Sequence, residues 1–264
     1  MTERIAQCVG SVGDLLRHAG DVAARTHEKD SARNLVTDYD RQVQALLEKA
    51  LGETFPGAAF FAEEEEQHVF AKSGELFVID PIDGTSNFVH GLGHSAVSVA
   101  LLRDGEPAAG VVYDPFAQRM YTAERGQGAR CNGVPCRVGT EDLAHGLCLF
   151  GTSPYDEDTH GLTCALFAAM LDAANDLRRM GAAALDLCDL ARGAGAVFFE
   201  ARLRPWDYAA AALILQEAGG VVTDFAGAPL SLSEPSSVLA GNPTAYRQAR
   251  ALLSSLAAFG AGQA

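Results

Sequence analysis

The segment from Leu76 to Phe88 constrains the fold more than any other part of the chain. Its apolar run ends at Ile79 and is followed by two carboxylates, Asp80 and Asp83, and by the turn residue Gly84. Short apolar runs bounded by turn residues are typical of buried strands. The segment therefore predicts a buried strand with two carboxylates at its carboxyl end.

Two carboxylates held this close repel each other unless a cation or a proton lies between them. Oxygen ligands, including the backbone carbonyl of Ile82, suit Mg²⁺ better than Zn²⁺ where no His or Cys is close in sequence. Gly84 lets backbone N–H groups approach an anion, and Thr85 adds a hydroxyl. The pattern predicts a metal-assisted phosphoryl site. An Asp-Pro-x-Asp-Gly segment is also a common turn, so by itself it leaves a purely structural role open.

A second acidic feature follows the apolar pair Phe60 and Phe61. Here a short predicted strand runs into four successive glutamates that begin at Glu63. Runs of like charge are normally solvated, which is the structural interpretation for Glu65 and Glu66. Glu63 is nearest the strand and is therefore the candidate to face a cation.

The third acidic feature is at the start of a predicted helix. Pro205 suits a first helical turn, an Ala/Leu run follows, and Gly219 with Gly220 ends the helix. Asp207 falls in the first turn, where a carboxylate interacts favourably with the helix dipole. Asp207 taken alone is thus explained as a helix-start residue.

Together the three segments resemble the inositol monophosphatase family. Residues 80–91 are similar to its first signature, residues 206–220 to its second, and Glu63 with Glu64 to its paired glutamates. The order and spacing agree from about Lys29 to about Asn242. The family belongs to a superfamily of Mg²⁺-dependent, lithium-sensitive sugar and nucleotide phosphatases. This resemblance implies an enzyme that binds two or three Mg²⁺ ions.

The resemblance also implies which residues hold the metals. Glu63, Asp80 and the Ile82 carbonyl would bind one ion. Asp80, Asp83 and Asp207 would bind a second. These carboxylates come from distant parts of the chain and would be destabilising without cations, so the metal-free acidic loops should be strained, mobile or partly protonated.

Further roles are implied by residues around this set. Thr85 and Glu63 would orient the attacking water, and Asp40 would organise a third, water-rich metal position. Lys29 matches a lysine near the site, and Glu200 matches a glutamate that contacts hydroxyls of inositol. Substrate contacts are expected from Asp83, Gly84, Thr85, Ser86, Glu200 and Asp207.

Three positions depart from the family pattern. Ala62 stands in place of the usual Gly before the glutamate pair, and Ala211 in place of a Gly in the second signature. Ala182 stands where a Thr or Ser is common, so one possible substrate contact is lost. None of the three is a proposed metal ligand, so they affect the substrate assignment more than the reaction.

We therefore expect Mg²⁺-dependent hydrolysis of a small phosphate monoester by metal-activated water. Inositol monophosphate is the leading substrate because Glu200 offers an acceptor for hydroxyls. Fructose-1,6-bisphosphate, 3′-phosphoadenosine 5′-phosphate and histidinol phosphate could use the same metals. A different class also stays open, namely a regulatory member of the family that binds a protein partner.

Composition limits the partners. A net charge of −14 argues against a nucleic-acid surface and against binding to anionic membranes. The sequence has no apolar run long enough for a membrane span and no secretion signal, so we expect a cytoplasmic protein. A homodimer is expected from the family alone. The six cysteines are scattered, which predicts buried or partly buried thiols rather than disulfides or a zinc site.

Periodicity predicts the order of the elements. Residues 3–26 and the stretch after Thr37 should be helices, and residues 58–131 should form a meander of antiparallel strands. Further on we expect a strand at 147–150, helices at about 159–175 and 182–192, and a strand at 196–199. The second-signature helix, a strand at 221–223 and a helix from about 244 should follow.

The pattern changes near residue 140, from α+β to α/β. We expect two lobes with the metal site between them, and the resemblance implies a layered α-β-α-β-α sandwich. Residues 1–140 would carry Glu63, Asp80 and Asp83, and residues 141–264 would carry Glu200 and Asp207. The loop at 151–158, which contains Tyr155, is either a surface connection or a loop that shapes the substrate site.

Overall fold

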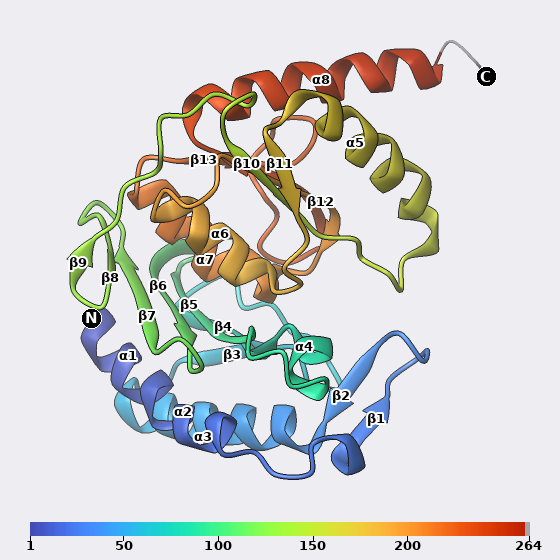
Figure 1. Ribbon diagram of the computed structural model, residues 1–264. Coiled ribbons are helices and arrows are strands. Elements are labelled where there is room, and N and C mark those ends of the chain that lie inside the picture. The colour runs from blue at the N-terminus through green and yellow to red at the C-terminus, as the bar shows by residue number, and fades with distance from the viewer. Residues whose placement is uncertain (262–264) are drawn as a thin grey trace.

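The computed structural model describes the backbone of residues 1–261 and the side chains of residues 1–255. A seven-stranded sheet and a five-stranded sheet lie between layers of helices (Figure 1). The larger sheet runs in sequence order through β3 (Ala59–Ala62), β4 (Glu75–Asp83), β5 (Ala96–Arg103), β6 (Glu106–Asp114), β7 (Arg119–Glu124), β8 (Ala129–Cys131) and β9 (Val134–Pro135). All neighbours in it are antiparallel except β3 and β4, whose carboxyl ends therefore meet at one edge.

The smaller sheet has the strand order β11, β10, β12, β14, β13. The three strands β11, β10 and β12 are parallel to one another, and β14 is antiparallel to both of its neighbours. Their bounds are β10 (Leu147–Phe150), β11 (Asp176–Arg178), β12 (Val197–Leu203), β13 (Val221–Thr223) and β14 (Ser236–Gly241).

Five layers follow from the helix contacts, as Figure 1 shows from bottom to top. Helices α1 (Thr2–Ser11) and α3 (Asp38–Thr54) cover one face of the larger sheet. Between the two sheets lie α6 (Ala183–Ala191) and α7 (Pro205–Glu217). The outer face of the smaller sheet is covered by α5 (His160–Ala173) and α8 (Pro243–Ala261). The predicted α-β-α-β-α sandwich is confirmed.

The alternation of side chains along β4 explains why its apolar run is continuous. Phe77 and Ile79 pack into the core beneath α1 and α3, whereas Leu76 and Val78 pack into the core shared with α6 and α7. Successive side chains of a strand point to opposite faces, and both faces of this strand are covered. Burial on both sides therefore places the end of β4 deep in the molecule.

Close packing between β6 and α7 depends on Gly110. A Cβ atom at this position would lie 2.6 Å from the carbonyl oxygen of Ala210. The helix is apolar all round, as expected for one buried between two sheets. The lack of a side chain on Gly110 lets the backbone of α7 approach the sheet and brings its first turn to the end of β4.

Thr37 caps the start of α3, the helix expected after this residue. The Thr37 hydroxyl accepts hydrogen bonds from the backbone N–H groups of Tyr39 and Asp40. Asp40 in turn accepts from the backbone N–H of Thr37 through Oδ2 at 2.7 Å. This reciprocal arrangement satisfies N–H groups that would otherwise be unpaired at the helix start.

The single helix predicted over residues 3–26 is wrong. The chain forms α1, then the short α2 (Gly13–Arg17), a 3₁₀ turn at Ala23–Arg25, and β1 (Thr26–Glu28). Between α2 and the turn, Asp21 has a left-handed backbone with φ of 51°, which no α-helix accommodates. Strand β1 then pairs with β2 (Leu35–Thr37), an antiparallel ribbon that the sequence did not predict.

In the second half, the predicted helices and the strands at 147–150 and 221–223 are confirmed with small changes of boundary. Strand β12 is longer than the prediction and places Glu200 within the strand rather than after it. Strands β11 and β14 were not predicted. β11 is a three-residue edge strand with mostly polar residues, so its sequence carries no apolar pattern.

All six cysteines have free thiols. Cys8, Cys136, Cys148 and Cys188 are buried, whereas Cys164 on α5 is exposed, so the expectation of burial is wrong for this residue. Within residues 1–261, no helix combines the length and the apolar character that crossing a bilayer requires.

Candidate active site

The carboxyl ends of β3 and β4 bring the first acidic residues together. The backbone N–H of Glu63 donates to the Ile79 carbonyl at 3.1 Å, which places Glu63 beside the start of the Asp80 turn. The pairing of β4 with β5 shifts register between Asp80 and Asp83, and the Asp80 carboxylate accepts from the backbone N–H of Ile82 at 3.0 Å. Such an irregularity changes the direction of side chains at a strand end.

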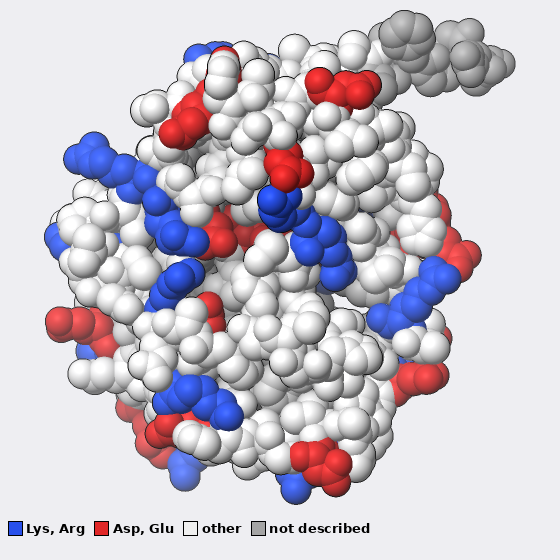
Figure 2. All heavy atoms as spheres, in the orientation of Figure 1, with Lys and Arg blue, Asp and Glu red and all other residues white. Residues whose placement is uncertain are grey.

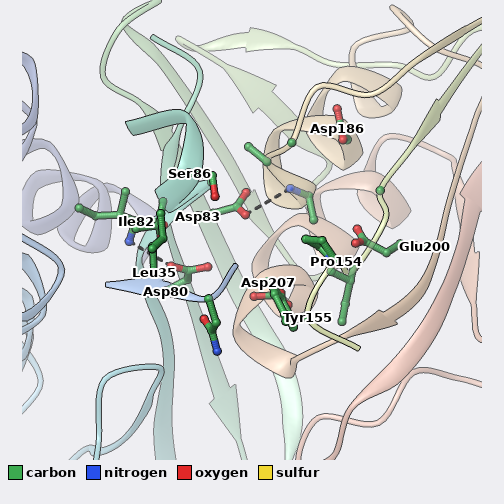
Figure 3. Close-up of a pocket in the computed structure, with 18 of the residues that line it drawn as sticks. Leu35, Asp80, Ile82, Asp83, Ser86, Pro154, Tyr155, Asp186, Glu200 and Asp207 are labelled. Atoms are coloured by element: carbon green, nitrogen blue, oxygen red, sulfur yellow. Dashed lines mark hydrogen bonds between the residues drawn. The ribbon is translucent and has the colours of Figure 1, made fainter. Parts of the chain in front are cut away.

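Asp83 reaches across to the helix layer between the sheets. Its two carboxylate oxygens accept from the backbone N–H groups of Ala183 at 3.2 Å and Ala184 at 2.8 Å, the first residues of α6. One of these contacts is drawn as a dashed line in Figure 3. Unpaired N–H groups and the helix dipole favour a carboxylate at this position. Asp83 therefore joins the end of β4 to the second half of the chain.

Asp207 occupies the first turn of α7, as predicted. Its carboxylate accepts from the backbone N–H of Arg204 at 2.6 Å, so the helix start fixes its direction. The neighbouring Trp206 carbonyl accepts from the Ser98 hydroxyl of β5 at 3.2 Å. These contacts hold the beginning of α7 against the larger sheet.

Glu200 enters the same space from β12. Its Oε1 atom accepts from the backbone N–H of Ser153 at 2.9 Å and from the Ser153 hydroxyl at 3.0 Å. The carboxylate packs against Gly151, where a Cβ atom would lie 1.9 Å from Oε2. The loop at 151–158 is thus anchored on the residue expected to contact substrate hydroxyls.

Six carboxylates line one pocket of about 120 Å³. Figure 3 shows four of them, Asp80, Asp83, Glu200 and Asp207, around a common space. The full set comes from three strands or strand ends and two helix starts, and consists of Glu63, Asp80, Asp83, Asp186, Glu200 and Asp207.

Burial and mutual repulsion raise the pKa values of these acids. Burial is the largest cause at Asp80 and Asp207, followed by repulsion from Glu63 and from Asp83, and both pKa values lie well above the usual range. Burial also raises the pKa of Asp83 to about 7, although the N–H groups of α6 act in the opposite direction. The pKa of Glu200 rises to about 7, again mainly through burial.

The donor set fits Mg²⁺. It consists of carboxylates and the Ile82 carbonyl, which are the hard oxygen ligands that this ion prefers. In residues 1–255, no three His, Cys, Asp or Glu side chains already surround a single metal position. The Ile82 carbonyl accepts from the Thr85 hydroxyl at 3.1 Å. Because the side chains of residues 1–255 do not already surround a single metal position, cation binding would be accompanied by rotations of side chains that line the pocket.

Comparison with known proteins shows to which family the chain belongs. The sequence profile of the inositol monophosphatase family matches residues 2–258. The chain belongs to the inositol monophosphatase family. It is 39% identical to inositol monophosphatase 2 of Mus musculus over 87% of this chain and 81% of that protein. It is 36% identical to the Nus factor SuhB of Salmonella typhimurium, over 91% of this chain and 92% of that protein.

A solved structure of the family has the same fold. The IMPase of Thermotoga maritima superposes with a TM-score of 0.86 at 31% identity, and the match covers 96% of each chain. The layered architecture of this family member is thus shared over almost its whole length.

Within this family member, two further predicted residues lie close to the acidic pocket. The Lys29 ammonium donates to Glu63 at 2.8 Å and to Glu64 at 2.6 Å. Burial would lower the pKa of Lys29, but the two glutamates outweigh it and raise that pKa. Asp40 is fully buried behind the pocket, where its Oδ1 lies 3.4 Å from the Thr85 hydroxyl. Burial raises the pKa of Asp40 to about 7.

Gly84, Thr85 and Ser86, from which substrate contacts are expected, line the pocket. Gly84 has a φ of 82°, and a Cβ atom there would lie 2.9 Å from the Gly181 carbonyl. A side chain would thus be strained and would also collide with the loop before α6. Thr85 begins the short helix α4 (Thr85–Val89), which follows directly on the Asp83 turn.

Three charged residues of the pocket were not singled out as site residues from the sequence. Asp186 in the first turn of α6 is 1% exposed, and its Oδ1 has no hydrogen-bond partner among the described residues. Burial, then repulsion from Asp83 and Glu200, raises its pKa well above the usual range. Arg33 and Arg179 also line the pocket. Asp186 lies four residues after Ala182, a position already compared with the family pattern, so the sequence held a signal for it. No sequence motif near Arg33 or Arg179 indicates that either arginine belongs to the site.

Proposed function

We propose that this protein hydrolyses a small phosphate monoester with the help of Mg²⁺. The observation that carries the proposal is the convergence of Glu63, Asp80 and Asp83 with Asp207 in one pocket. The pKa values of Asp80, Asp83 and Asp207 are raised, so these groups would be stabilised by a cation between them. Buried carboxylates this close together lower the stability of the folded protein unless they bind a cation.

The chain's own residues suit an in-line attack by water. Bound Mg²⁺ supplies charge neutralisation, a lowered pKa for water and stabilisation of the leaving oxygen. Thr85 is placed to orient the water, because its hydroxyl lies within reach of both the Ile82 carbonyl and Asp40. Glu63 lines the same pocket and is held by Lys29. We assign Glu63 to accept the proton of the attacking water.

Inositol monophosphate is the proposed substrate. Both hydrogen bonds that Glu200 accepts from Ser153 go to Oε1, and no described group donates to its Oε2. A polyol hydroxyl could therefore donate to Oε2 within the pocket. Tyr155 lines the same pocket as Glu200, which favours the substrate-shaping role of its loop over a mere surface connection.

A sugar bisphosphate such as fructose-1,6-bisphosphate is the second candidate substrate. Arg179 lines the pocket and forms no ion pair among the described side chains. Arg178 and Arg202 are instead paired with acids of their own, Asp176 for the first and Asp158 for the second. A cation left free beside the pocket suits a second anionic group on the substrate.

A regulatory role is the second candidate function. Relatives at 36% identity are named Nus factor SuhB, whereas the mouse relative is named as an inositol monophosphatase. On the face in Figure 2, basic side chains are scattered among acidic and uncharged ones, without a continuous basic surface. We therefore favour a protein partner over direct nucleic-acid contact for such a role. A cytoplasmic homodimer with two lobes divided near residue 140 remains part of the proposal.

The deciding experiment measures phosphate release from inositol 1-phosphate by purified protein, with Mg²⁺ and with a chelator. Release that stops on chelation and is lost in Asp83→Asn supports the proposal. Release from fructose-1,6-bisphosphate alone would move the assignment to the bisphosphate. No release from either substrate with Mg²⁺ would refute the phosphatase proposal for these substrates and leave the regulatory role. Lithium should inhibit turnover, and unchanged turnover in lithium would contradict that part of the resemblance.

A further inference from the structure

The loop between β3 and β4 carries Glu63 but has few anchors. Its residues 66–69 are exposed, and Val69 alone is 67% exposed. The Glu63 side chain is held by Lys29, which itself belongs to the turn between β1 and β2. In the absence of a cation, repulsion from the other carboxylates acts to push Glu63 out of the pocket.

His68, in the middle of this loop, forms a hydrogen bond and two aromatic contacts. Its Nε2 lies 3.3 Å from the carbonyl oxygen of Glu63, so the ring N–H donates back to the residue that begins the loop. The His68 ring lies 4.8 Å from the Trp206 ring at an interplanar angle of 36°. Phe61 completes the group, with its ring 5.7 Å from His68 and 5.6 Å from Trp206.

The position of Trp206 is itself fixed by its surroundings. It is only 8% exposed, its carbonyl accepts from the Ser98 hydroxyl, and it directly precedes Asp207 at the start of α7. His68 thus touches the backbone of Glu63 on one side and the neighbour of Asp207 on the other. Glu63 and Asp207 are two of the proposed metal ligands, and they come from the end of β3 and the start of α7.

We propose that His68 is a positioning residue that sets the place of Glu63 relative to Asp207. The inference rests on the proposed metal role of these two carboxylates. Glu63 and Asp207 are expected at two adjoining metal positions that share Asp80, and metal ligands must be held within about 0.5 Å of their working geometry. The backbone N–H of Glu63 is paired with the Ile79 carbonyl, and the His68 hydrogen bond holds the carbonyl side of Glu63, which Lys29 does not touch. His68 would thereby strengthen Mg²⁺ binding without contacting metal or substrate.

Three variants separate the two contacts. His68→Ala removes both, His68→Phe keeps an aromatic ring on Trp206 but loses the hydrogen bond, and Gln67→Ala is the control because Gln67 is an exposed neighbour in the same loop. We expect His68→Ala to bind Mg²⁺ about tenfold more weakly, because it loses both the hydrogen bond to the Glu63 carbonyl and the ring contact with Trp206. His68→Phe should lie between His68→Ala and the unaltered protein, and Gln67→Ala should match the unaltered protein.

Mg²⁺ affinity is measured by calorimetry without substrate. At saturating Mg²⁺, kcat and KM of His68→Ala should stay within about twofold of the unaltered protein, because the positioned ligand set is then restored. Trp206 is the only tryptophan, so its emission reports the loss of the His68 ring directly. Amide hydrogen exchange of residues 63–68 reports whether the loop is released.

The outcomes are distinct from those of the proposed function. Faster exchange at 63–68, changed Trp206 emission and weaker Mg²⁺ binding in His68→Ala support the positioning role. Unchanged exchange, or unchanged Mg²⁺ affinity despite a released loop, overturns it. If the unaltered protein binds Mg²⁺ but releases no phosphate, the proposed function fails while the affinity comparison still decides the role of His68. If the unaltered protein binds no Mg²⁺, both are overturned.

Discussion

In the absence of divalent cations, the free energy of unfolding of this protein should decrease as the pH rises from about 4 to about 7. The folded protein holds Asp83 at a pKa of about 7, against an ordinary value of 3.8, because the carboxyl is buried. An acid whose pKa is raised on folding favours the protonated form in the folded state. Its stabilising contribution is therefore complete below about pH 4 and is lost as the pH rises through about 7.

The size of the effect follows from the same values. At 1.36 kcal/mol for each pH unit, a rise of the Asp83 pKa from 3.8 to about 7 corresponds to about 4 kcal/mol. The pKa of Glu200 is also raised to about 7, but neighbouring carboxyls share their protons, so the contributions do not add. We take about 4 kcal/mol as the scale for the whole cluster, which corresponds to a change in Tm of about 10 °C for a chain of this size.

Calorimetric or fluorimetric melting in a chelator, at a series of pH values between about 5 and 8, measures this effect. Mg²⁺ should remove most of the loss, since a ligand at 100 times its Kd stabilises by about 2.7 kcal/mol. Asp83→Asn is the matched variant and should show a shallower fall in the chelator, because one titrating group is gone. A chelated protein that is equally stable, or more stable, at the higher pH would refute the reasoning.

Three further outcomes are expected. Asp207→Asn should lower phosphate release from inositol 1-phosphate more than about 100-fold while the circular dichroism spectrum is retained, because a proposed metal ligand is lost; activity near that of the unaltered protein would remove Asp207 from the ligand set. Tyr155→Ala should change the ratio of kcat/KM for inositol 1-phosphate and fructose-1,6-bisphosphate, since Tyr155 lines the pocket; an unchanged ratio would make its loop a simple connection. Gly110→Ala should lower the free energy of unfolding by about 1–3 kcal/mol in a denaturant titration, because the new methyl group would lie 2.6 Å from the Ala210 carbonyl oxygen. No loss of stability would show that α7 can move away from β6 without cost.

Local signals in the sequence predicted those parts of the site that depend on neighbours along the chain. The apolar run before Asp80 predicted a strand that is buried on both faces. Thr37 predicted the start of α3, and Pro205 with the Ala/Leu run predicted a helix that has Asp207 in its first turn. Each of these depends on side-chain periodicity or on a cap within a few residues.

The parts that the sequence did not predict depend on segments far apart in the chain. Asp83 accepts from Ala183 and Ala184, about a hundred residues later, and nothing around Asp83 specifies that partner. Glu200 is fixed by Ser153 in the same way. The N-terminal helix was overextended because its apolar residues continue past the break, which is visible only in the backbone at Asp21.

The sequence by itself therefore determined the family, the order of most elements and the chemical nature of the proposed metal ligands. These follow from residue type and local spacing, which do not depend on the rest of the molecule. The tertiary structure alone decided which carboxylates share a pocket, how far burial raises their pKa values, that Asp186 and Arg179 line the same pocket, and that His68 packs against Trp206. Burial and electrostatic interaction depend on distance through space, and distance through space is set only when the layers pack.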